Sequence, residues 1–197
     1  MSMRGDWVGY YDDQGDREPR ELLRDALERF DREGGAGRAI DIGCGAGIET
    51  MEMLRRGWEV LAIDAERDGI RRLRDRAGAD PRLTAIVSRM QDVDVPAVDL
   101  VHAAFSLPFC PPPAFPHLWE RIRAALRDGG RFVGNLFGDR DTWASTEPAM
   151  TFFDVASARG LFDGLELEVF EEEEEDGDAW GRPKHWHSYA VIARRPG

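Results

Sequence analysis

Short apolar runs alternate with amphipathic segments along most of the 197-residue chain, and this alternation limits the folds that it can adopt. Apolar runs predict strands over residues 38–42, 59–63, 83–87, 98–105 and 131–137. Helical spacing predicts helices over residues 18–33, 47–56, 67–77 and 114–127. Strands that are apolar throughout are buried on both faces, so the pattern predicts an α/β fold in which helices cover both sides of a parallel, doubly wound sheet.

The last third of the chain departs from this alternation. A helix is predicted near residues 152–162, followed by strands over residues 165–169 and 185–194. Two consecutive strands joined by a loop form an antiparallel hairpin, which we expect at an edge of the sheet and which brings the total to seven strands. Residues 1–35 are expected to form a leader and a helix that cap a site, and residues 36–197 a single globular unit.

The formal net charge of −12 argues against a nucleic-acid partner, because proteins that bind phosphate backbones usually present a basic face. Seven of the acidic residues lie close together, as Glu171–Glu175, Asp176 and Asp178. We interpret this run as a solvated loop between the last two strands. An acidic lid that recruits a cationic acceptor is the alternative.

The sequence also bears on location. No apolar stretch of roughly 18 residues predicts a membrane span. Residues 1–6 carry charges that no apolar segment follows, so they do not resemble a secretory signal. Cys44 and Cys110 lie in different motifs and form no disulfide framework, which favours a reducing, cytoplasmic setting. We expect a monomer or a homodimer.

A glycine-rich turn, Asp41-Ile42-Gly43-Cys44-Gly45-Ala46-Gly47, closes the first predicted strand and opens a helix. Glycines allow a tight turn and let a ligand approach the main chain without a Cβ atom in the way. Asp64 ends the second strand, where a carboxylate can accept hydrogen bonds from both hydroxyls of a ribose. These features together predict a nucleoside-containing ligand at the carboxyl ends of the strands.

Three ligand classes compete for this turn. A phosphate-binding P-loop needs Lys followed by Ser or Thr where Ile48 and Glu49 stand. A dinucleotide site needs its third glycine at the position of Ile48, and Glu49 and Glu52 would repel a pyrophosphate at the helix N-terminus. S-adenosylmethionine carries no phosphate, and Asp41 can help to hold its ammonium group while glycine N–H groups face its carboxylate. The turn therefore favours the phosphate-free ligand.

Residues 40–47 together with Asp64 resemble the first two motifs of class I S-adenosylmethionine-dependent methyltransferases, and the resemblance covers roughly residues 36–194. It implies the strand order 3-2-1-4-5-7-6 with the last strand antiparallel, S-adenosylmethionine as cofactor and S-adenosylhomocysteine as product. It also implies an adenine pocket in the loop after the third strand. Asp92 of this loop either lines that pocket or is simply a turn residue. The implied cofactor site consists of Asp41, Gly43, Cys44, Gly45, Gly47, Asp64, Ala65, Met90, Gln91, Asp92, Phe105 and Ser106.

Two further segments, residues 105–111 and 134–138, are similar to the small tellurite-resistance and thiopurine type of metabolite methyltransferases. This similarity implies a small-molecule acceptor, which should lie between the leader and the ends of strands four and five. The candidates for its wall are Tyr10, Tyr11, Ser106, Phe109, Arg140 and Trp143, with Cys110 as a further candidate. As an alternative, the aromatic residues of the leader only pack against the sheet. The alternative for Arg140 is that it forms local ion pairs in a turn.

The candidate catalytic residues are His185, His187, Arg140 and Tyr11. Methyl transfer depends mainly on alignment, and a base is needed only if the acceptor must lose a proton. Cys44 is interpreted as a packing residue, His102 as a core residue with a catalytic base as the alternative, and Arg20 as a surface residue or a partner of a carboxylate. His-x-His is a weak metal motif without further ligands nearby, so no metal is expected.

The sequence thus leads to one main hypothesis, the transfer of a methyl group to O, N, S or a related heteroatom of a small metabolite. A cofactor-binding module without catalysis is the second hypothesis, because no unmistakable base is present. A nicotinamide-dependent oxidoreductase is the third.

Overall fold

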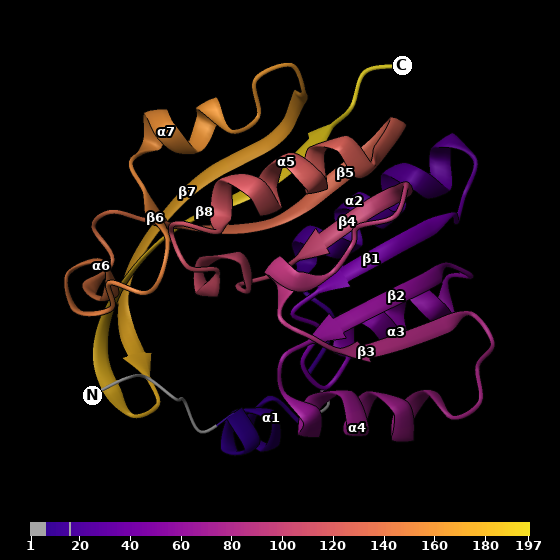
Figure 1. Ribbon diagram of the computed structural model, residues 1–197, viewed down its shortest axis with the longest axis horizontal. Coiled ribbons are helices and arrows are strands. Elements are labelled where there is room, and N and C mark those ends of the chain that lie inside the picture. Colours follow the sequence, from indigo (N-terminus) through magenta and orange to yellow (C-terminus); the bar gives the residue numbers. More distant parts are fainter. Residues whose placement is uncertain (1–6, 16) are drawn as a thin grey trace.

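A twisted, mostly parallel sheet with the strand order β3-β2-β1-β4-β5-β8-β7 runs through the molecule (Figure 1). The computed structural model describes residues 7–15 and 17–197. Its strands are β1 (Arg38–Ile42), β2 (Glu59–Asp64), β3 (Leu83–Val87), β4 (Val98–Ala103), β5 (Leu126–Gly138), β6 (Phe152–Phe153), β7 (Glu166–Ala179) and β8 (Arg182–Arg194). The predicted order and the antiparallel last strand are confirmed. The predicted count of seven is one too low, because the two-residue β6 pairs with the end of β5.

Helices cover both faces of the sheet, as the apolar strands require. They are α1 (Trp7–Gln14), α2 (Glu21–Glu33), α3 (Ile48–Arg55), α4 (Arg67–Ala77), α5 (Phe115–Ala125), α6 (Thr142–Thr146) and α7 (Val155–Gly160), with short 3-10 turns η1 (Met90–Asp92) and η2 (Leu107–Phe109). Buried residues of α2, α3 and α4 form one apolar cluster with the sheet. Those of α5 and α7 form another cluster on the opposite face. The helix predicted over residues 152–162 is replaced by β6 and the shorter α7.

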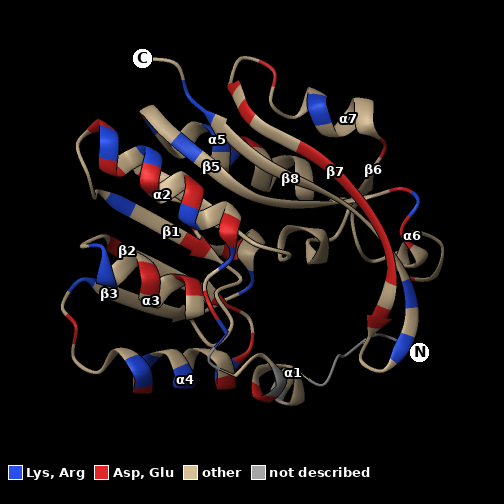
Figure 2. Cartoon of the chain, turned by 180° about the vertical axis from the view of Figure 1, so that it is seen from behind, with Lys and Arg blue, Asp and Glu red and all other residues tan. Residues whose placement is uncertain are grey.

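The prediction that the acidic run forms a loop is wrong, although Glu171–Asp178 are exposed to solvent as expected. Glu171–Asp178 lie within β7, which pairs with β8 in a long curved hairpin (Figure 2). Trp180 and Gly181 form its two-residue turn with φ of 52° and 70°, as a type I′ turn requires. Imidazoles of β8 that face acidic side chains of β7 offset the low strand propensity of Glu and Asp, as in the pairs Glu174–His187 and Asp176–His185.

The N-terminal part contributes to the same architecture. Leu23 and Leu27 of α2 are fully buried against the sheet, while α1 lies beside α4 at the carboxyl ends of the strands (Figure 1). The predicted division into residues 1–35 and 36–197 stays a prediction, and the interpretation of residues 1–6 lies outside the described residues. In the described part of the chain, no helix is long and apolar enough to cross a membrane.

Candidate functional site

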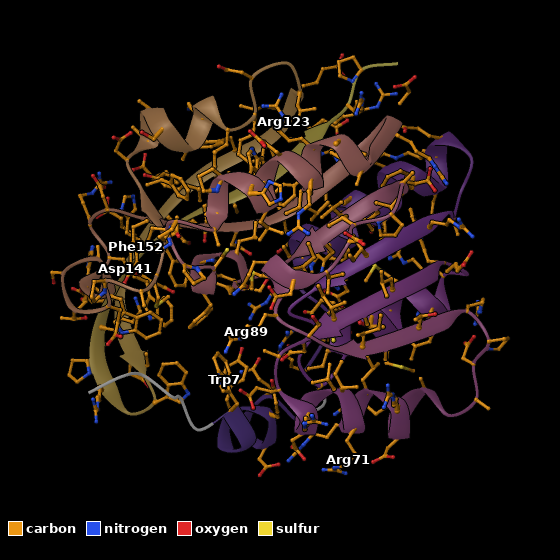
Figure 3. The ribbon with its side chains drawn as sticks, viewed as in Figure 1. Trp7, Arg71, Arg89, Arg123, Asp141 and Phe152 are labelled. Carbon is orange, nitrogen blue, oxygen red and sulfur yellow. The ribbon has the colours of Figure 1, made fainter. Side chains whose placement is uncertain are left out.

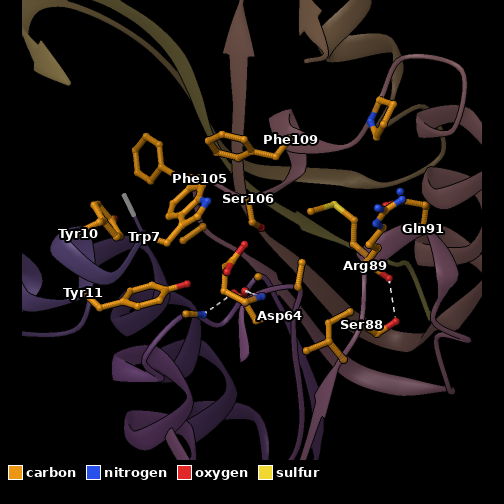
Figure 4. A pocket seen from close by; sticks show the side chains of 18 residues that line it. Trp7, Tyr10, Tyr11, Asp64, Ser88, Arg89, Gln91, Phe105, Ser106 and Phe109 are labelled. Carbon is orange, nitrogen blue, oxygen red and sulfur yellow. Dashed lines mark hydrogen bonds between the residues drawn. The ribbon is translucent and has the colours of Figure 1, made fainter. Parts of the chain in front are cut away.

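A cleft of about 370 Å³ opens over the carboxyl ends of β1, β2, β3 and β4, and α1 forms its outer wall (Figure 4). Side chains enter it from both sides, with Trp7 on α1 and Arg89 on the loop after β3 directed toward the same space (Figure 3). A smaller cavity of about 60 Å³ adjoins it. The two share Tyr10, Tyr11, Gly43, Gly45 and Ala104 in their walls, so they form one continuous site.

The structure brings most of the predicted cofactor residues to this site. The large cleft is lined by Gly43, Gly45, Asp64, Ala65, Met90, Gln91, Phe105 and Ser106, and the small cavity by Asp41, Cys44 and Gly47. Asp92 is exposed on η1 and lines neither cavity, which agrees with the alternative interpretation of Asp92 as a turn residue. Contact of any of these residues with a cofactor stays a prediction.

The floor of the cleft is the backbone of the glycine-rich turn. Gly43 and Gly47 have φ of 75° and 84°, in the left-handed region that favours glycine. A Cβ atom on Gly43 would lie 2.3 Å from Cβ of Ser106, and one on Gly47 would lie 2.4 Å from Cδ1 of Leu73. The Ser106 hydroxyl donates to the carbonyl of Ile42 at 2.5 Å and so ties the end of β4 to that of β1. The turn therefore has no room for side chains.

Asp64 lies at the end of β2 and holds this turn in place. Its Oδ2 accepts a hydrogen bond from Gly45 N and its Oδ1 one from Glu66 N, both at 2.8 Å. Burial raises the pKa of Asp64, although these two backbone bonds oppose the rise. A carboxylate offers about four acceptor sites, so Asp64 keeps lone pairs for further donors in the cleft. Gly45 and Asp64 thus share one cleft, as the predicted nucleoside site demands.

Asp41 lies in the wall of the small cavity and is 1% exposed. Its Oδ2 accepts a hydrogen bond from the Thr50 hydroxyl at 2.5 Å, and its Oδ1 lies 2.8 Å from Nδ1 of His102. His102 is buried, as expected of a core residue, and it also lines the small cavity. These two partners fix the orientation of the carboxylate.

Aromatic side chains of α1 cover the site. Tyr11 packs against Gly45 and is 5% exposed, and Trp7 stacks on it while contacting the edge of Phe109. Burial, reinforced by the charge of Asp64, raises the pKa of the Tyr11 hydroxyl. This hydroxyl therefore stays protonated at neutral pH, where it can donate a hydrogen bond but cannot act as a base.

Two arginines stand at the rim of the small cavity. Arg17 forms an ion pair with Glu49 at 2.7 Å. The guanidinium of Arg20 lies 4.5 Å from the ring centroid of Phe105, and burial lowers its pKa. Arg20 is thus part of the site wall and is not a simple surface residue.

The structure places His185 and His187 on β8 of the hairpin and Arg140 in the turn after β5, and none of the three lines either cavity. Arg140 forms ion pairs with Glu172 and Glu174 and lies 3.2 Å from Nε2 of the fully buried His187. The exposed His185 lies 2.7 Å from a carboxylate oxygen of Asp176. Cross-strand charge pairing accounts for these positions. Among the candidate catalytic residues, only Tyr11 lines the cleft.

This charged group includes the donor set of a conceivable metal site. Ligand atoms of Glu172, Glu174 and His187 lie within 4.8 Å of one another. The guanidinium of Arg140 contacts all three, so a cation already balances their charge. The expectation that no metal binds here stays a prediction.

The remaining predicted wall residues divide between cleft and core. Phe109 lines the cleft, whereas Trp143 packs behind it at 6.4 Å between ring centroids. Cys110 is fully buried in the core, and burial raises its pKa to about 11. Burial also raises the pKa of Cys44, so neither thiol supplies a thiolate at neutral pH.

The cleft also contains residues that the sequence analysis missed, namely Ile63, Glu66, Ser88, Arg89, Ala104 and Pro111. No motif marks them. Their only signal is position, because each lies within a few residues of a predicted site residue at the end of a strand.

Residues 39–130 match a protein-family model described as a methyltransferase domain. Over 101 residues, the chain is 33% identical to the carboxy-S-adenosyl-L-methionine synthase of Trichlorobacter lovleyi, a match that covers 47% of this chain and 41% of that protein. The synthase of the same name from Photobacterium profundum is 30% identical over 103 residues, 49% of this chain and 42% of that protein. The match thus spans about two fifths of the length of these curated relatives.

Solved structures show the same fold over nearly the whole chain. TehB from Haemophilus influenzae superimposes with a TM-score of 0.78 at 14% identity, over 96% of this chain and 67% of that one. The N-methyltransferase NodS from Bradyrhizobium japonicum gives a TM-score of 0.65 at 17% identity, over 89% and 97% of the two chains.

A third structure contains ligands. The 1,6-didemethyltoxoflavin-N1-methyltransferase of Burkholderia thailandensis, with bound 1,6-didemethyltoxoflavin and S-adenosylhomocysteine, gives a TM-score of 0.63 at 20% identity, over 96% of this chain and 85% of that one. At these identities the likeness establishes the fold. Residues 39–130 thus match a methyltransferase domain, and the chain has the fold of the class I S-adenosylmethionine-dependent methyltransferases.

Proposed function

We propose that this protein transfers a methyl group from S-adenosylmethionine to a heteroatom, O, N, S or a related element, of a small-molecule metabolite. One observation carries the proposal: the glycine-rich turn, Asp64 and Asp41 line a single continuous site at the strand ends. Its larger part, of about 370 Å³, is within the usual size range of small-molecule pockets.

The residues present fit this cofactor. Asp64 retains acceptor sites for two ribose hydroxyls, and Met90 and Gln91 line the cleft where an adenine would lie. The backbone cradle at Gly43 and Gly45 excludes side chains, which lets a ligand lie against the main chain. Asp41 in the small cavity supplies a buried negative charge for the ammonium group of the methionyl end.

The cofactor supplies an activated methyl group on its sulfonium. The chain's own task is then to orient the acceptor and to exclude water, which the aromatic cover of Trp7, Tyr10, Tyr11 and Phe109 can do. In favourable cases such positioning lowers the barrier by about 7–11 kcal/mol. Among the described residues that line the large cleft there is no His or Lys, so the site favours an acceptor that is nucleophilic without losing a proton to the protein.

Calorimetric titration with S-adenosylhomocysteine tests the proposal. We expect binding, and we expect Asp64→Ala to weaken it by about 1–3 kcal/mol, the cost of losing a charged hydrogen-bond partner. Asp75→Asn is the matched control, because it removes an exposed carboxylate of α4 that lines neither cavity. Absence of binding at high micromolar ligand would refute the proposal, and an unchanged affinity in Asp64→Ala would mean that the ribose is held elsewhere.

The name of the curated relatives supports a second candidate, the synthesis of a carboxylated S-adenosylmethionine. Mass spectrometry of the cofactor products distinguishes the two activities. Methyl transfer yields S-adenosylhomocysteine together with a methylated acceptor, whereas the second activity yields a carboxylated S-adenosylmethionine and needs a second substrate that donates the carboxyl group. A module that only binds the cofactor would yield neither product when labelled cofactor is screened against metabolites.

A further inference from the structure

His102 and Asp41 form a buried pair at the bottom of the small cavity. They occupy paired positions on the neighbouring strands β4 and β1, so their side chains point to the same side of the sheet. They are 3% and 1% exposed, and Nδ1 of His102 lies 2.8 Å from Oδ1 of Asp41. Both side chains line the small cavity.

The contact with Asp41 determines which ring nitrogen of a neutral His102 carries hydrogen. An ionised carboxylate only accepts hydrogen bonds, so Nδ1 must be the donor, and Nε2 is left as an acceptor. No described residue forms a hydrogen bond with this Nε2. Buried polar atoms normally have partners, so an acceptor left unpartnered beside a cavity indicates a ligand that donates to it.

The chemistry of the cavity specifies that donor. Asp41 and His102 offer one full negative charge and two kinds of acceptor, which suits an ammonium group because it has three N–H donors and no acceptor. At the rim, Arg17 and Arg20 carry two positive charges, and Glu49, which is 2.7 Å from Arg17 and 4.0 Å from Arg20, balances one of them, so one positive charge is left for a carboxylate. This arrangement, negative on the sheet side and positive at the rim, is complementary to a zwitterionic α-amino acid group.

We propose that His102 is a cofactor-binding residue, with its Nε2 accepting one hydrogen of the α-ammonium group of the methionyl end while Asp41 balances the charge. The inference rests on the proposed function and assigns to this site a residue that the sequence analysis took for part of the core. It differs from a purely structural role, in which His102 would only orient Asp41.

Two ligands separate these roles when titrated into the full-length protein. S-adenosylhomocysteine carries the α-amino acid group, and 5′-methylthioadenosine shares its nucleoside and sulfur but lacks that group. His102→Asn keeps a side-chain N–H near the position of Nδ1 and removes the acceptor at the position of Nε2. We expect it to weaken S-adenosylhomocysteine binding by at least about tenfold and to leave 5′-methylthioadenosine binding within about twofold of wild type.

Two further variants complete the comparison. His102→Gln places an amide oxygen near the position of Nε2, and we expect it to bind S-adenosylhomocysteine more tightly than His102→Asn does. His117→Asn removes an exposed imidazole of α5 and is expected to change neither affinity. An unchanged S-adenosylhomocysteine affinity in His102→Asn, an equal loss for both ligands, or a Gln variant no better than the Asn variant would overturn the inference.

A measurement on the wild-type protein does not depend on whether the variants fold. In nitrogen NMR spectra, Nε2 of His102 should appear unprotonated in the free protein and shift on addition of S-adenosylhomocysteine, but not of 5′-methylthioadenosine. A protonated Nε2 in the free protein, or equal shifts with both ligands, would contradict the inference. If wild-type protein fails to bind S-adenosylhomocysteine at all, the proposed function fails, whereas binding without these differences removes only the role of His102.

Discussion

Lys184 of β8 is a buried cation whose removal should destabilise the protein strongly. Its side chain is 1% exposed and forms an ion pair with the fully buried side chain of Asp141 (Figure 3). The ammonium lies 4.0 Å from the ring centroid of Trp143 and 3.9 Å from that of Trp186. Asp141 also accepts backbone hydrogen bonds from Trp143 at 2.9 Å and from His187 at 3.3 Å. The pair therefore joins α6 to the hairpin.

The magnitude follows from the groups left behind by Lys184→Met. Breaking a buried ion pair by removing one partner costs about 3–5 kcal/mol, because the other charge remains buried. Two backbone N–H donors still serve Asp141, which places the expected cost near the lower end of that range. The loss of two desolvated cation–π contacts adds to the cost, and sulfur–aromatic contacts of the new methionine offset part of it. We expect a loss of about 3–4 kcal/mol, a large fraction of the 5–15 kcal/mol that is typical of a domain.

Urea unfolding, followed by tryptophan fluorescence and by circular dichroism, measures this free energy. The double variant Lys184→Met/Asp141→Asn removes the orphaned charge and should recover at least about 2 kcal/mol relative to Lys184→Met alone. A single variant that loses less than about 1 kcal/mol, or a double variant no more stable than the single one, would refute the reasoning that an unpaired buried carboxylate dominates the cost.

Two further predictions concern the turn and the hairpin. Gly47→Ala should reduce both the stability of the protein and its affinity for S-adenosylhomocysteine, because an L-residue at φ 84° is strained by about 1–3 kcal/mol and its Cβ atom would lie 2.4 Å from Leu73. Thermal unfolding and calorimetry measure the two effects. Gly160→Ala is the control that both assays should tolerate, because no atom lies within 4 Å of the added Cβ atom. Hydrogen bonds to two hairpin carboxylates raise the pKa of His185 in the folded protein. The protonated imidazole therefore stabilises the fold fully at pH values below the unperturbed histidine pKa of 6.5, and this stabilisation is lost as the pH rises through the raised pKa. The difference in unfolding free energy between wild type and His185→Gln should therefore be larger at about pH 6 than at about pH 9, and an equal difference at both would contradict the assignment.

The location of the site could be predicted because it depends on local patterns, whereas the order of the sheet is implied by the resemblance to the class I methyltransferases. Continuous apolar strands, the glycine-rich turn and an acid at the end of the next strand are all readable within short windows. The topology then brings strand ends together, so Gly45 and Asp64 meet at 2.8 Å although they are 19 positions apart. The family resemblance, and not this rule, predicts Met90 and Gln91 in the cleft, which both residues line.

Features that depend on pairing between distant residues could not be predicted in this way. Glu and Asp have low strand propensity, so the acidic run predicts a loop, whereas contacts with His185 and His187 of β8 and with Arg140 stabilise it as a strand. The same pairing draws Arg140 and both histidines toward the hairpin carboxylates, which local sequence does not indicate. The contact between His102 and Asp41 could not be predicted either, because the sequence does not show that the two residues occupy paired positions on β4 and β1.

The acidity of β7 also affects how the protein behaves toward other copies of itself. Within the described residues β7 pairs only with β8, so β7 is an edge strand of the sheet, and the backbone of its outer side could accept another strand. Two such strands approaching each other would bring closely spaced carboxylates into register, and like charges placed opposite each other are destabilising. The run Glu171–Asp176 thus acts as an electrostatic barrier to intermolecular strand addition, one that weakens in acid as its carboxylates become protonated.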